Sequence, residues 1–335
     1  PDGSKDENVF DIMQGVSINI FVKSKKTRNN FAEMYFSELF GTRNKKYSIL
    51  QNPDITYKKL EPTSPYYFYE PWDNSNSDKY DIGINIDELF ILNTSGIVTM
   101  GDSFALAESF DILEERIKKF LSYDYTPEQL TQEYSLGKNY ADFILAGKTQ
   151  LNFDKNRIVK ISYRPFDYMY TYFDNKVLWR PRTNVMIHFS HGNNIGLISA
   201  RSNKSDTCDH FYITKYMSET KCGERTTQSA IFPLFTYSVA LGKTIRNPNL
   251  KPEIVAEISK KLGLPFAPYS DGGSTESFAP IDLLDYIYAV LHSPKYRETY
   301  KEFLKIDFPR VPYPTDKEMF WKMVKLGGEI RKLHL

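Results

Sequence analysis

The chain has 335 residues, of which 41% are hydrophobic and 25% charged, and its formal net charge is +1. The length predicts two domains, or one domain with a large appendage. A net charge this small excludes a protein that coats nucleic acid or anionic membrane by bulk electrostatics.

Two further features restrict the class of protein. Cys208 and Cys222 are the two cysteines of the chain, too few for a disulfide scaffold and suited to a reducing cytoplasm. No apolar run approaches the roughly 20 residues that span a bilayer, so we expect no membrane partner. The polar start "PDGSKDEN" has no initiator Met and no signal-peptide pattern, which is typical of a piece of a longer protein.

The first predicted elements are two short strands, Val16 to Val22 and Phe31 to Phe36, joined by the polar "SKKTRNN". We expect them to pair antiparallel. Two strands alone do not make a stable sheet. They therefore resemble the closing edge of a sheet whose other strands lie elsewhere.

A helical insert is predicted over residues 104–148. Apolar residues recur at helical spacing in "SFALAESFDILEERIKKFL", and Thr126 with Gln129 forms a capping-box pattern at the start of a further helix. Pro127 suits the first turn of that helix. The insert interrupts a region of short strand-like runs.

From Arg157 to Tyr237 the pattern predicts strands again. "YMYTYF" alternates Tyr168, Tyr170 and Tyr172 with a second set of side chains, and Asp174-Asn175 predicts a turn that lets "VLW" pair back along it. Further strands are predicted at "NVMIHF", "IGLISAR" and "HFYITKY".

The last third is predicted to be helical. Pro252, Pro280 and Ser293-Pro294 signal helix starts, and Thr315 to Glu318 forms a second capping-box pattern. The fold class is therefore mixed α/β, with an antiparallel or mixed sheet, a helical insert and a helical C-terminal region.

Basic residues are unevenly distributed along the chain. Between residues 157 and 225 there are eleven Lys and Arg against six Asp and Glu, a surplus of five that leaves a net charge of −4 for the remainder. Arginines on strand ends and loops, mixed with Asn, Ser and Thr, suit phosphate oxygens and guanine edges. Solvated strand faces with a few structural salt bridges have the same composition, so both interpretations remain open at this point.

Catalytic and metal-binding patterns are weak. "LGKT" at 241–244 resembles the end of a phosphate-binding loop, but Tyr237 stands where that loop requires Gly. The spacing of His188, His191, Cys208, His210 and Cys222 fits no paired-ligand zinc template. "SPYYFY" at 64–69 has Tyr66 where the Asn/Asp-Pro-Pro-Tyr loop of amino-methyltransferases has Pro. We expect no catalytic residue and no metal site in this chain.

Nine segments, in order, resemble one family. They are "ENVFDIMQGVSINIFVKSK", "SPYYFYEPWD", "NTSGIVTMGDSF", "SYRPFDYMYTYFDN", "RPRTNVMIHF", "NIGLISAR", "FPLFTY", "DYIYAVLHSPKYRETYKEFLKIDFPRVPYP" and "LGGEIRKLHL". The chain resembles the C-terminal end of the single-polypeptide Type I (Type ISP) restriction-modification enzymes over its whole length.

The resemblance implies a domain organisation. Residues 1–50 would be the last strands of an adenine methyltransferase, 51–250 the DNA target-recognition core with its helical insert, and 251–335 a helical region packed on both. Nuclease, helicase and methyltransferase domains of the same polypeptide would lie upstream. S-adenosylmethionine, ATP and Mg²⁺ would serve those domains, and this segment would hold no cofactor and turn over no substrate by itself.

The implied function is recognition of double-stranded DNA. The candidates for phosphate or guanine are Arg164, Arg180, Arg182, Arg201, Lys215 and Arg225, with Lys204 and Lys221 as further basic candidates. The candidates for other base edges are Asn193, Asn194, Ser202, Asn203 and Thr226. Family members read different sequences, so we expect the base readers in "SNKSDTCD" and "SETKCGERTT", and a supporting or phosphate-binding role for the arginines of "RPFD" and "RPR".

Alternatives remain for several of these residues. Arg164 could pair internally with Asp167, and Arg180 and Arg182 could brace a hairpin. The stripe Leu284, Ile287, Tyr288 and Leu291 could clamp the recognition domain against the upstream part or could be ordinary core. The whole segment could also be part of a methyltransferase catalytic unit, or a protein-interaction domain without DNA contact.

Overall fold

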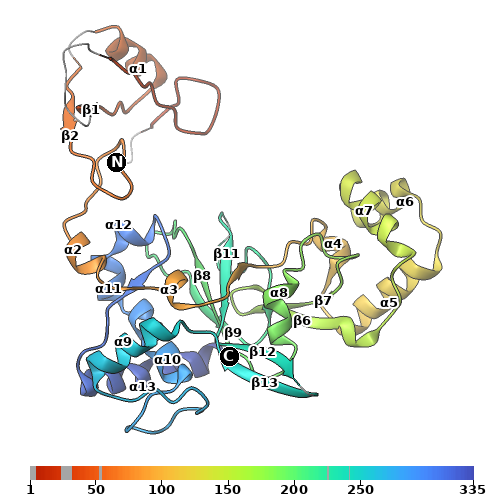
Figure 1. The fold of residues 1–335 in the computed structure, drawn as a ribbon. Coiled ribbons are helices and arrows are strands. Elements are labelled where there is room, and N and C mark those ends of the chain that lie inside the picture. The colour runs from red at the N-terminus through yellow and green to blue at the C-terminus, as the bar shows by residue number, and fades with distance from the viewer. Residues whose placement is uncertain (1–4, 24–31, 53–54, 225, 241) are drawn as a thin grey trace. The chain divides into compact units, whose positions relative to one another are not determined.

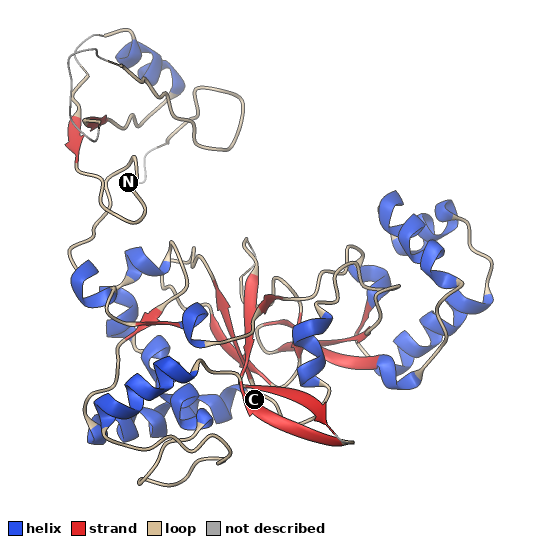
Figure 2. Ribbon diagram, in the orientation of Figure 1, coloured by secondary structure: helices blue, strands red, loops and turns tan. Residues whose placement is uncertain are grey.

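The computed structural model describes residues 5–23, 32–52, 55–224, 226–240 and 242–335. The chain divides into two compact units, residues 1–74 and residues 75–335 (Figure 1). Helices and strands occur in both units (Figure 2), so the chain is a mixed α/β protein, as the sequence predicted.

The first unit has little regular structure among its described residues. β1 (Met34–Phe36) pairs antiparallel with β2 (Lys58–Leu60), and α1 (Arg43–Leu50) lies between them in the sequence. The predicted pairing of Val16–Val22 with 31–36 is wrong, because β1 takes β2 as its partner and residues 16–22 form no strand. Phe31 lies outside the described residues.

Residues 16–22 have no regular secondary structure and no partner strand in the part of the chain that is described. A strand needs a neighbour for its backbone hydrogen bonds, which is the physical reason that the pattern alone does not form one. Ile18 is 74% exposed and Ile20 81% exposed. The segment therefore carries apolar side chains that this unit does not bury.

The described residues of the second unit form two four-stranded sheets. The first has the order β10-β6-β7-β5, with β6 antiparallel to β7 and parallel to β10. Its strands are β5 (Leu106–Ala107), β6 (Ile158–Arg164), β7 (Asp167–Tyr172) and β10 (Met217–Ser218).

The predicted strand at "YMYTYF" is confirmed, but its predicted partner is wrong. β7 pairs with β6 and β5, not with the "VLW" segment. Phe166 takes a left-handed conformation (φ 60°) after Pro165, so the hairpin turns before β7 instead of after it. Asp174 instead closes a compact turn in which Leu178 N–H donates to the Asp174 carbonyl at 2.8 Å.

The second sheet has the order β4-β11-β8-β9. Its strands are β4 (Thr94–Ser95), β8 (Gly196–Ala200), β9 (Phe211–Thr214) and β11 (Ser229–Pro233). β8 and β9 confirm the predicted strands at "IGLISAR" and "HFYITKY". Residues 96–97 connect the sheets, because Gly96 N–H donates to Ser229 O at 3.1 Å and Ile97 N–H donates to Ser218 O at 2.8 Å. A Cβ at Gly96 would overlap the backbone of Glu219, so this close approach requires glycine.

The helical insert is confirmed. It consists of α4 (Asp102–Ala105), α5 (Phe110–Ser122), α6 (Pro127–Tyr134) and α7 (Lys138–Lys148). Leu113, Ile117 and Phe120 of α5 are fully buried, as their spacing predicted. Thr126 and Gln129 form the predicted capping box at the start of α6.

The predicted strand at "NVMIHF" is wrong. The segment forms α8 (Thr183–Met186) and the 3-10 turn η2 (Ile187–Phe189). Arg182 is left-handed (φ 54°), and its carbonyl accepts hydrogen bonds from Val185 N and Met186 N, each at 3.0 Å. Val185 and Met186 are thereby buried together. The free energy gained by burying them outweighs their preference for a strand.

Short elements join these parts of the second unit. They are α2 (Ser77–Tyr80), β3 (Ile84–Asn85), α3 (Ile86–Leu89), η1 (Lys155–Arg157) and β14 (Arg310–Val311). A separate hairpin is formed by β12 (Phe235–Ala240) and β13 (Lys243–Pro248). This hairpin contains the "LGKT" motif, so Lys243 and Thr244 begin a strand instead of a phosphate-binding helix; Leu241 lies outside the described residues.

The C-terminal third is helical, as predicted. Its helices are α9 (Pro252–Leu262), α10 (Pro280–His292), α11 (Pro294–Thr299), α12 (Lys301–Leu304) and α13 (Lys317–His334). The cap of α13 is Asp316, not the predicted Thr315. None of the helices in the described ranges is long and apolar enough to cross a bilayer.

The apolar stripe of α10 is core. Leu284, Ile287, Tyr288 and Leu291 are each at most 1% exposed. α10 packs against α13, where Asp285 accepts from Arg331 Nε at 2.6 Å and from Arg331 Nη2 at 2.9 Å. The stripe is therefore ordinary core, one of the two alternatives that its spacing left open, while the packing of the C-terminal region on an upstream part stays a prediction.

Candidate nucleic-acid interface

Glu219 organises one group of the predicted residues. Its carboxylate is buried and accepts from Arg164 Nη1 at 2.6 Å and from the Lys221 backbone N–H at 2.8 Å. Burial raises the pKa of Glu219, while the Lys221 N–H and the Arg164 guanidinium act in the opposite direction. The predicted internal pair of Arg164 with Asp167 is thus replaced by a pair with Glu219.

Arg164 is held on two sides. Its guanidinium lies over the Tyr163 ring, 3.9 Å from the centroid, and the Tyr163 hydroxyl donates to Asp102 at 2.9 Å. About a third of the Arg164 side chain remains exposed. The residue therefore presents an edge of a fixed cation at the surface instead of a freely rotating one.

Arg180 is brought close to this group by the backbone. Arg180 N–H donates to Val98 O at 3.0 Å, and Val98 N–H donates to Arg180 O at 3.1 Å. The neighbouring Ile97 pairs with Glu219. Arg164, Arg180 and Lys221 are thus gathered from three distant parts of the sequence.

Four of the predicted basic residues have exposed side chains that form no ion pair with a described residue. They are Arg180, Lys204, Lys215 and Lys221. Arg182 is half-buried, and its Nε has no hydrogen-bond partner in the described part of the chain. These cations are available to an external anion without breaking an internal ion pair.

The loop from Arg201 to Asn203 is tied to the end of α12. Arg201 Nε donates to Asp307 Oδ1 at 2.8 Å, and Ser202 Oγ donates to Lys305 O at 2.6 Å. The Arg201 side chain is still 69% exposed. An exposed ion pair of this kind contributes only about 0–1 kcal/mol to stability. A DNA phosphate can therefore replace Asp307 as the partner of Arg201.

Two predicted base readers are buried. Asn194 is 2% exposed, donates to Phe235 O at 2.8 Å and accepts from Phe235 N at 3.1 Å. Asn203 is 1% exposed, and its Oδ1 accepts from His210 N at 3.3 Å. Both amides bond within the fold, and their burial argues against contact with a base.

Two other polar candidates, Asn193 and Thr226, are exposed, whereas Ser202 is half-buried. Asn193 lies beside the buried Asn194, and Thr226 donates from its N–H to Glu224 Oε1 at 2.7 Å. Arg225 lies outside the described residues.

Lys160 is a half-buried cation outside the set of DNA candidates that the sequence predicts. Its Nζ lies 4.4 Å from the Tyr168 ring centroid and 5.1 Å from that of Tyr216. Lys160 and Tyr168 lie on the same face of the β6–β7 pair, because Lys160 is opposite Tyr170. The sequence does not predict this contact, because it does not give the pairing of β6 with β7.

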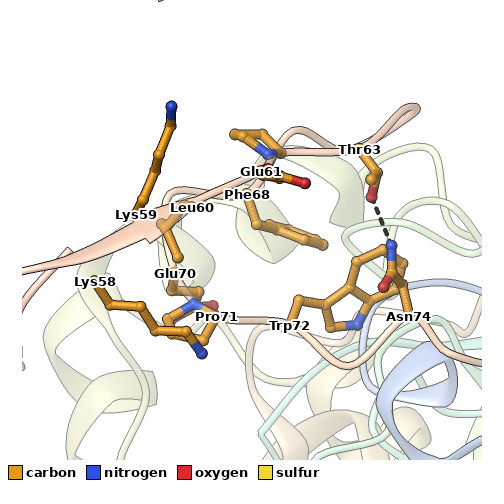
Figure 3. Close-up of a pocket in the computed structure, with 11 residues that line it drawn as sticks. Lys58, Lys59, Leu60, Glu61, Thr63, Phe68, Glu70, Pro71, Trp72 and Asn74 are labelled. Carbon is orange, nitrogen blue, oxygen red and sulfur yellow. Dashed lines mark hydrogen bonds between the residues drawn. The ribbon is translucent and has the colours of Figure 1, made fainter. Parts of the chain in front are cut away.

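A pocket of about 230 Å³ lies in the first unit (Figure 3). Phe68 and Trp72 contribute its apolar walls, and a hydrogen bond of 3.1 Å joins Thr63 to Asn74 at one end. Its charged lining residues are two lysines and two glutamates, Lys58, Lys59, Glu61 and Glu70. These charges cancel and none of the DNA candidates lines the pocket, so it is not an anion site.

Comparisons with known proteins give a consistent result. The model of the Type ISP C-terminal specificity domain matches residues 88–335. No curated protein matches the sequence.

Three solved structures share the fold. A cryo-electron microscopy structure of a DrdV–DNA complex is 19% identical with a TM-score of 0.68, over 91% of this chain and 31% of that one. A nuclease-deletion mutant of the Type ISP restriction-modification enzyme LlaGI with a DNA substrate mimic is 20% identical, with a TM-score of 0.61, over 92% and 28%. The ATP-dependent Type ISP enzyme LlaBIII bound to DNA is 19% identical, with a TM-score of 0.59, over 83% and 18%. The chain thus spans less than a third of the length of each.

Proposed function

The chain belongs to the Type ISP C-terminal specificity domain family, and from this membership we propose that it recognises a sequence in double-stranded DNA for a restriction-modification enzyme. The observation that carries the proposal is the set of exposed basic side chains of the second unit that form no ion pair with any residue the structure describes. Arg180, Lys215 and Lys221 lie at strand ends and turns, where a side chain can reach a phosphate or a groove edge.

The proposed role of each candidate residue follows from the burial and the contacts of its side chain. Arg164 is fixed between Tyr163 and Glu219, so it holds the surface in shape and offers one edge to a phosphate. The exposed lysines Lys204, Lys215 and Lys221 bind phosphates, each as a point charge. Asn193 and Thr226, exposed in loops, are the remaining candidates for base edges.

The rest of the enzyme is assigned by the same proposal. Residues 1–50 complete the sheet of an adenine methyltransferase, which explains the exposed apolar side chains of residues 16–22. Upstream nuclease and helicase domains supply DNA cleavage and ATP-driven translocation, and the parent enzyme takes S-adenosylmethionine for methylation together with ATP and Mg²⁺. Cys208 and Cys222 are both free and buried, which suits a cytoplasmic protein.

Salt dependence of DNA binding tests the proposal. We expect the chain to bind a mixed-sequence duplex, with log K falling linearly with log salt. Replacement of Lys215 or Lys221 by Ala should each lower the slope by about 0.9, the value for one phosphate contact. Lys260→Ala is the matched control, because Lys260 is exposed on α9 in the helical region.

Two outcomes contradict the proposal. Absence of salt-dependent DNA binding favours a protein-interaction domain. Measurable affinity of this chain for labelled S-adenosylmethionine favours a methyltransferase catalytic unit.

A further inference from the structure

The β12–β13 hairpin is a two-stranded ribbon whose two halves differ. All six positions pair in register, from Phe235 with Pro248 to Ala240 with Lys243. In Figure 1 the ribbon extends away from the sheet that contains β8 and β11. The three inner pairs are buried or half-buried, whereas all six residues of the three outer pairs are exposed.

The inner half is firmly anchored. The side chain of Asn194 bonds both the N–H and the carbonyl of Phe235, and Tyr237 N–H donates to His188 Nδ1 at 3.1 Å. Arg246 lies over the Phe235 ring, 4.4 Å from the centroid, and pairs with Asp271 at 2.9 Å. These contacts fix the direction of the ribbon, and the described residues of its outer half make no contact of this kind.

The ribbon is continuous with the proposed DNA surface. η2, which supplies His188, follows directly on α8, and α8 begins immediately after Arg180 and Arg182. The loop after η2 carries the exposed Asn193. The root of the ribbon therefore lies next to a segment that contains three of the predicted DNA contacts.

The chemistry of the outer half suits DNA. From Phe235 to Pro248 the chain has Lys243 and Arg246 and no acidic residue. The exposed outer side chains combine a cation, the hydroxyls of Ser238 and Thr244, and the methyl groups of Val239, which is 72% exposed. Cations and hydroxyls contact phosphates and base edges, and methyl groups contact the methyl group of thymine.

The dimensions also agree. Three strand residues span about 10 Å at about 3.4 Å each. The major groove is about 12 Å wide and about 8.5 Å deep and admits a two-stranded ribbon. We propose that the outer half of the β12–β13 ribbon enters the major groove of duplex DNA, with Lys243 on a phosphate and Val239 and Thr244 at base edges.

This inference rests on the proposed function and deepens it. A protein partner fits less well, because a stable protein interface buries about 800 Å² on each side and six residues at the end of a ribbon offer far less. Lys243, which forms no ion pair with a described residue, also favours a polyanion over a generic protein surface.

Photo-crosslinking from the ribbon tests the position of the DNA. Cys208 is 0% exposed and Cys222 is 2% exposed, so a new surface cysteine takes up a photoactivatable azidophenacyl group selectively. Thr244→Cys places the group on the ribbon, and Lys260→Cys places it on α9 as the control. We expect the 244 adduct to crosslink a bound mixed-sequence duplex at least tenfold more than the 260 adduct.

Groove ligands and a charge variant complete the test. Methyl green, which occupies the major groove, should suppress the crosslink, and netropsin, which occupies the minor groove, should not. Lys243→Ala should reduce the salt slope of binding by about 0.9, while Lys260→Ala leaves it unchanged.

The outcomes separate the two proposals. Salt-dependent DNA binding with equal crosslinking from 244 and 260 overturns the ribbon and leaves the DNA-recognition function standing. Suppression by netropsin alone overturns the major-groove placement. A chain that binds no DNA overturns the function and the ribbon together.

Discussion

The guanidinium of Arg164 donates to the buried carboxylate of Glu219 at 2.6 Å, across 55 positions of sequence. The pair joins the end of β6 to the segment after β10, where Lys221 also bonds Glu219 through its backbone. Arg164, which the sequence predicts to contact DNA, is therefore also the counter-ion of a buried glutamate within the protein.

Removing Arg164 should destabilise the protein in a pH-dependent way. Burial already raises the pKa of Glu219, so the native state holds its proton to higher pH than the unfolded state and loses stability as pH rises through that interval. Arg164→Ala removes a group that lowers the pKa of Glu219, so the penalty should grow as pH rises above the ordinary glutamate range, to about 1–3 kcal/mol at neutral pH.

Urea unfolding of wild type and Arg164→Ala at a series of pH values measures this. Arg164→Ala in a Glu219→Gln background is the matched control and should show little pH dependence of the difference. A penalty that is constant from acid to neutral pH would mean that Glu219 is not the partner that matters.

The Asp285–Arg331 pair should stabilise the packing of α10 on α13. Both oxygens of the carboxylate accept from the guanidinium, and the Asp285 side chain is only 6% exposed. Arg331→Ala leaves a buried carboxylate without its cation and should cost about 3–5 kcal/mol. Arg331→Lys should be intermediate, because an ammonium cannot make both bonds in the same plane.

Thermal unfolding of the two variants, with Lys332→Ala as an exposed neighbour, checks this order of stabilities. An Arg331→Ala variant as stable as Lys332→Ala would contradict it.

The close approach of the same two helices depends on Gly327. A Cβ there would overlap the carbonyl oxygen of Asp285, which is backbone and cannot move aside. Gly327→Ala should therefore separate the helices and destabilise the protein by more than about 2 kcal/mol, as overpacking does. Gly137→Ala is the control, since a Cβ at Gly137 meets nothing within 4 Å. Circular dichroism melts of the two variants distinguish a packing requirement from a general sensitivity to alanine.

Variants of the adjacent residues Asn193 and Asn194 should distinguish a structural role from a role in DNA binding. Asn194→Ala leaves the backbone groups of Phe235 unpaired in the interior and should cost about 2–4 kcal/mol of stability. Asn193→Ala changes an exposed side chain and should alter stability by less than about 0.5 kcal/mol. Denaturant unfolding measures both, and DNA affinity of Asn193→Ala reports whether that side chain reaches the duplex. Equal losses of stability in the two variants would contradict the assignment of Asn194 to the fold and of Asn193 to the exposed surface.

The sequence by itself determined the features that local physics controls. The helical insert follows from the apolar spacing of α5 and from the capping box at Thr126, because helical periodicity and capping act over three or four residues. The strand at "YMYTYF" follows from its two-residue alternation in the same way. The ordered segments of the sequence also indicated the family, because the resemblance does not depend on the tertiary structure.

Only the tertiary structure decided which residues meet. The partner of β7, the pairing of Arg164 with Glu219 and the burial of Asn194 against Phe235 each join positions that are distant in sequence, and local patterns carry no information about such pairs. The sequence does not show whether a hydrophilic side chain is exposed or forms hydrogen bonds with buried backbone groups. The fold separates the two cases, because a buried polar group must find hydrogen-bond partners and those partners lie in other elements.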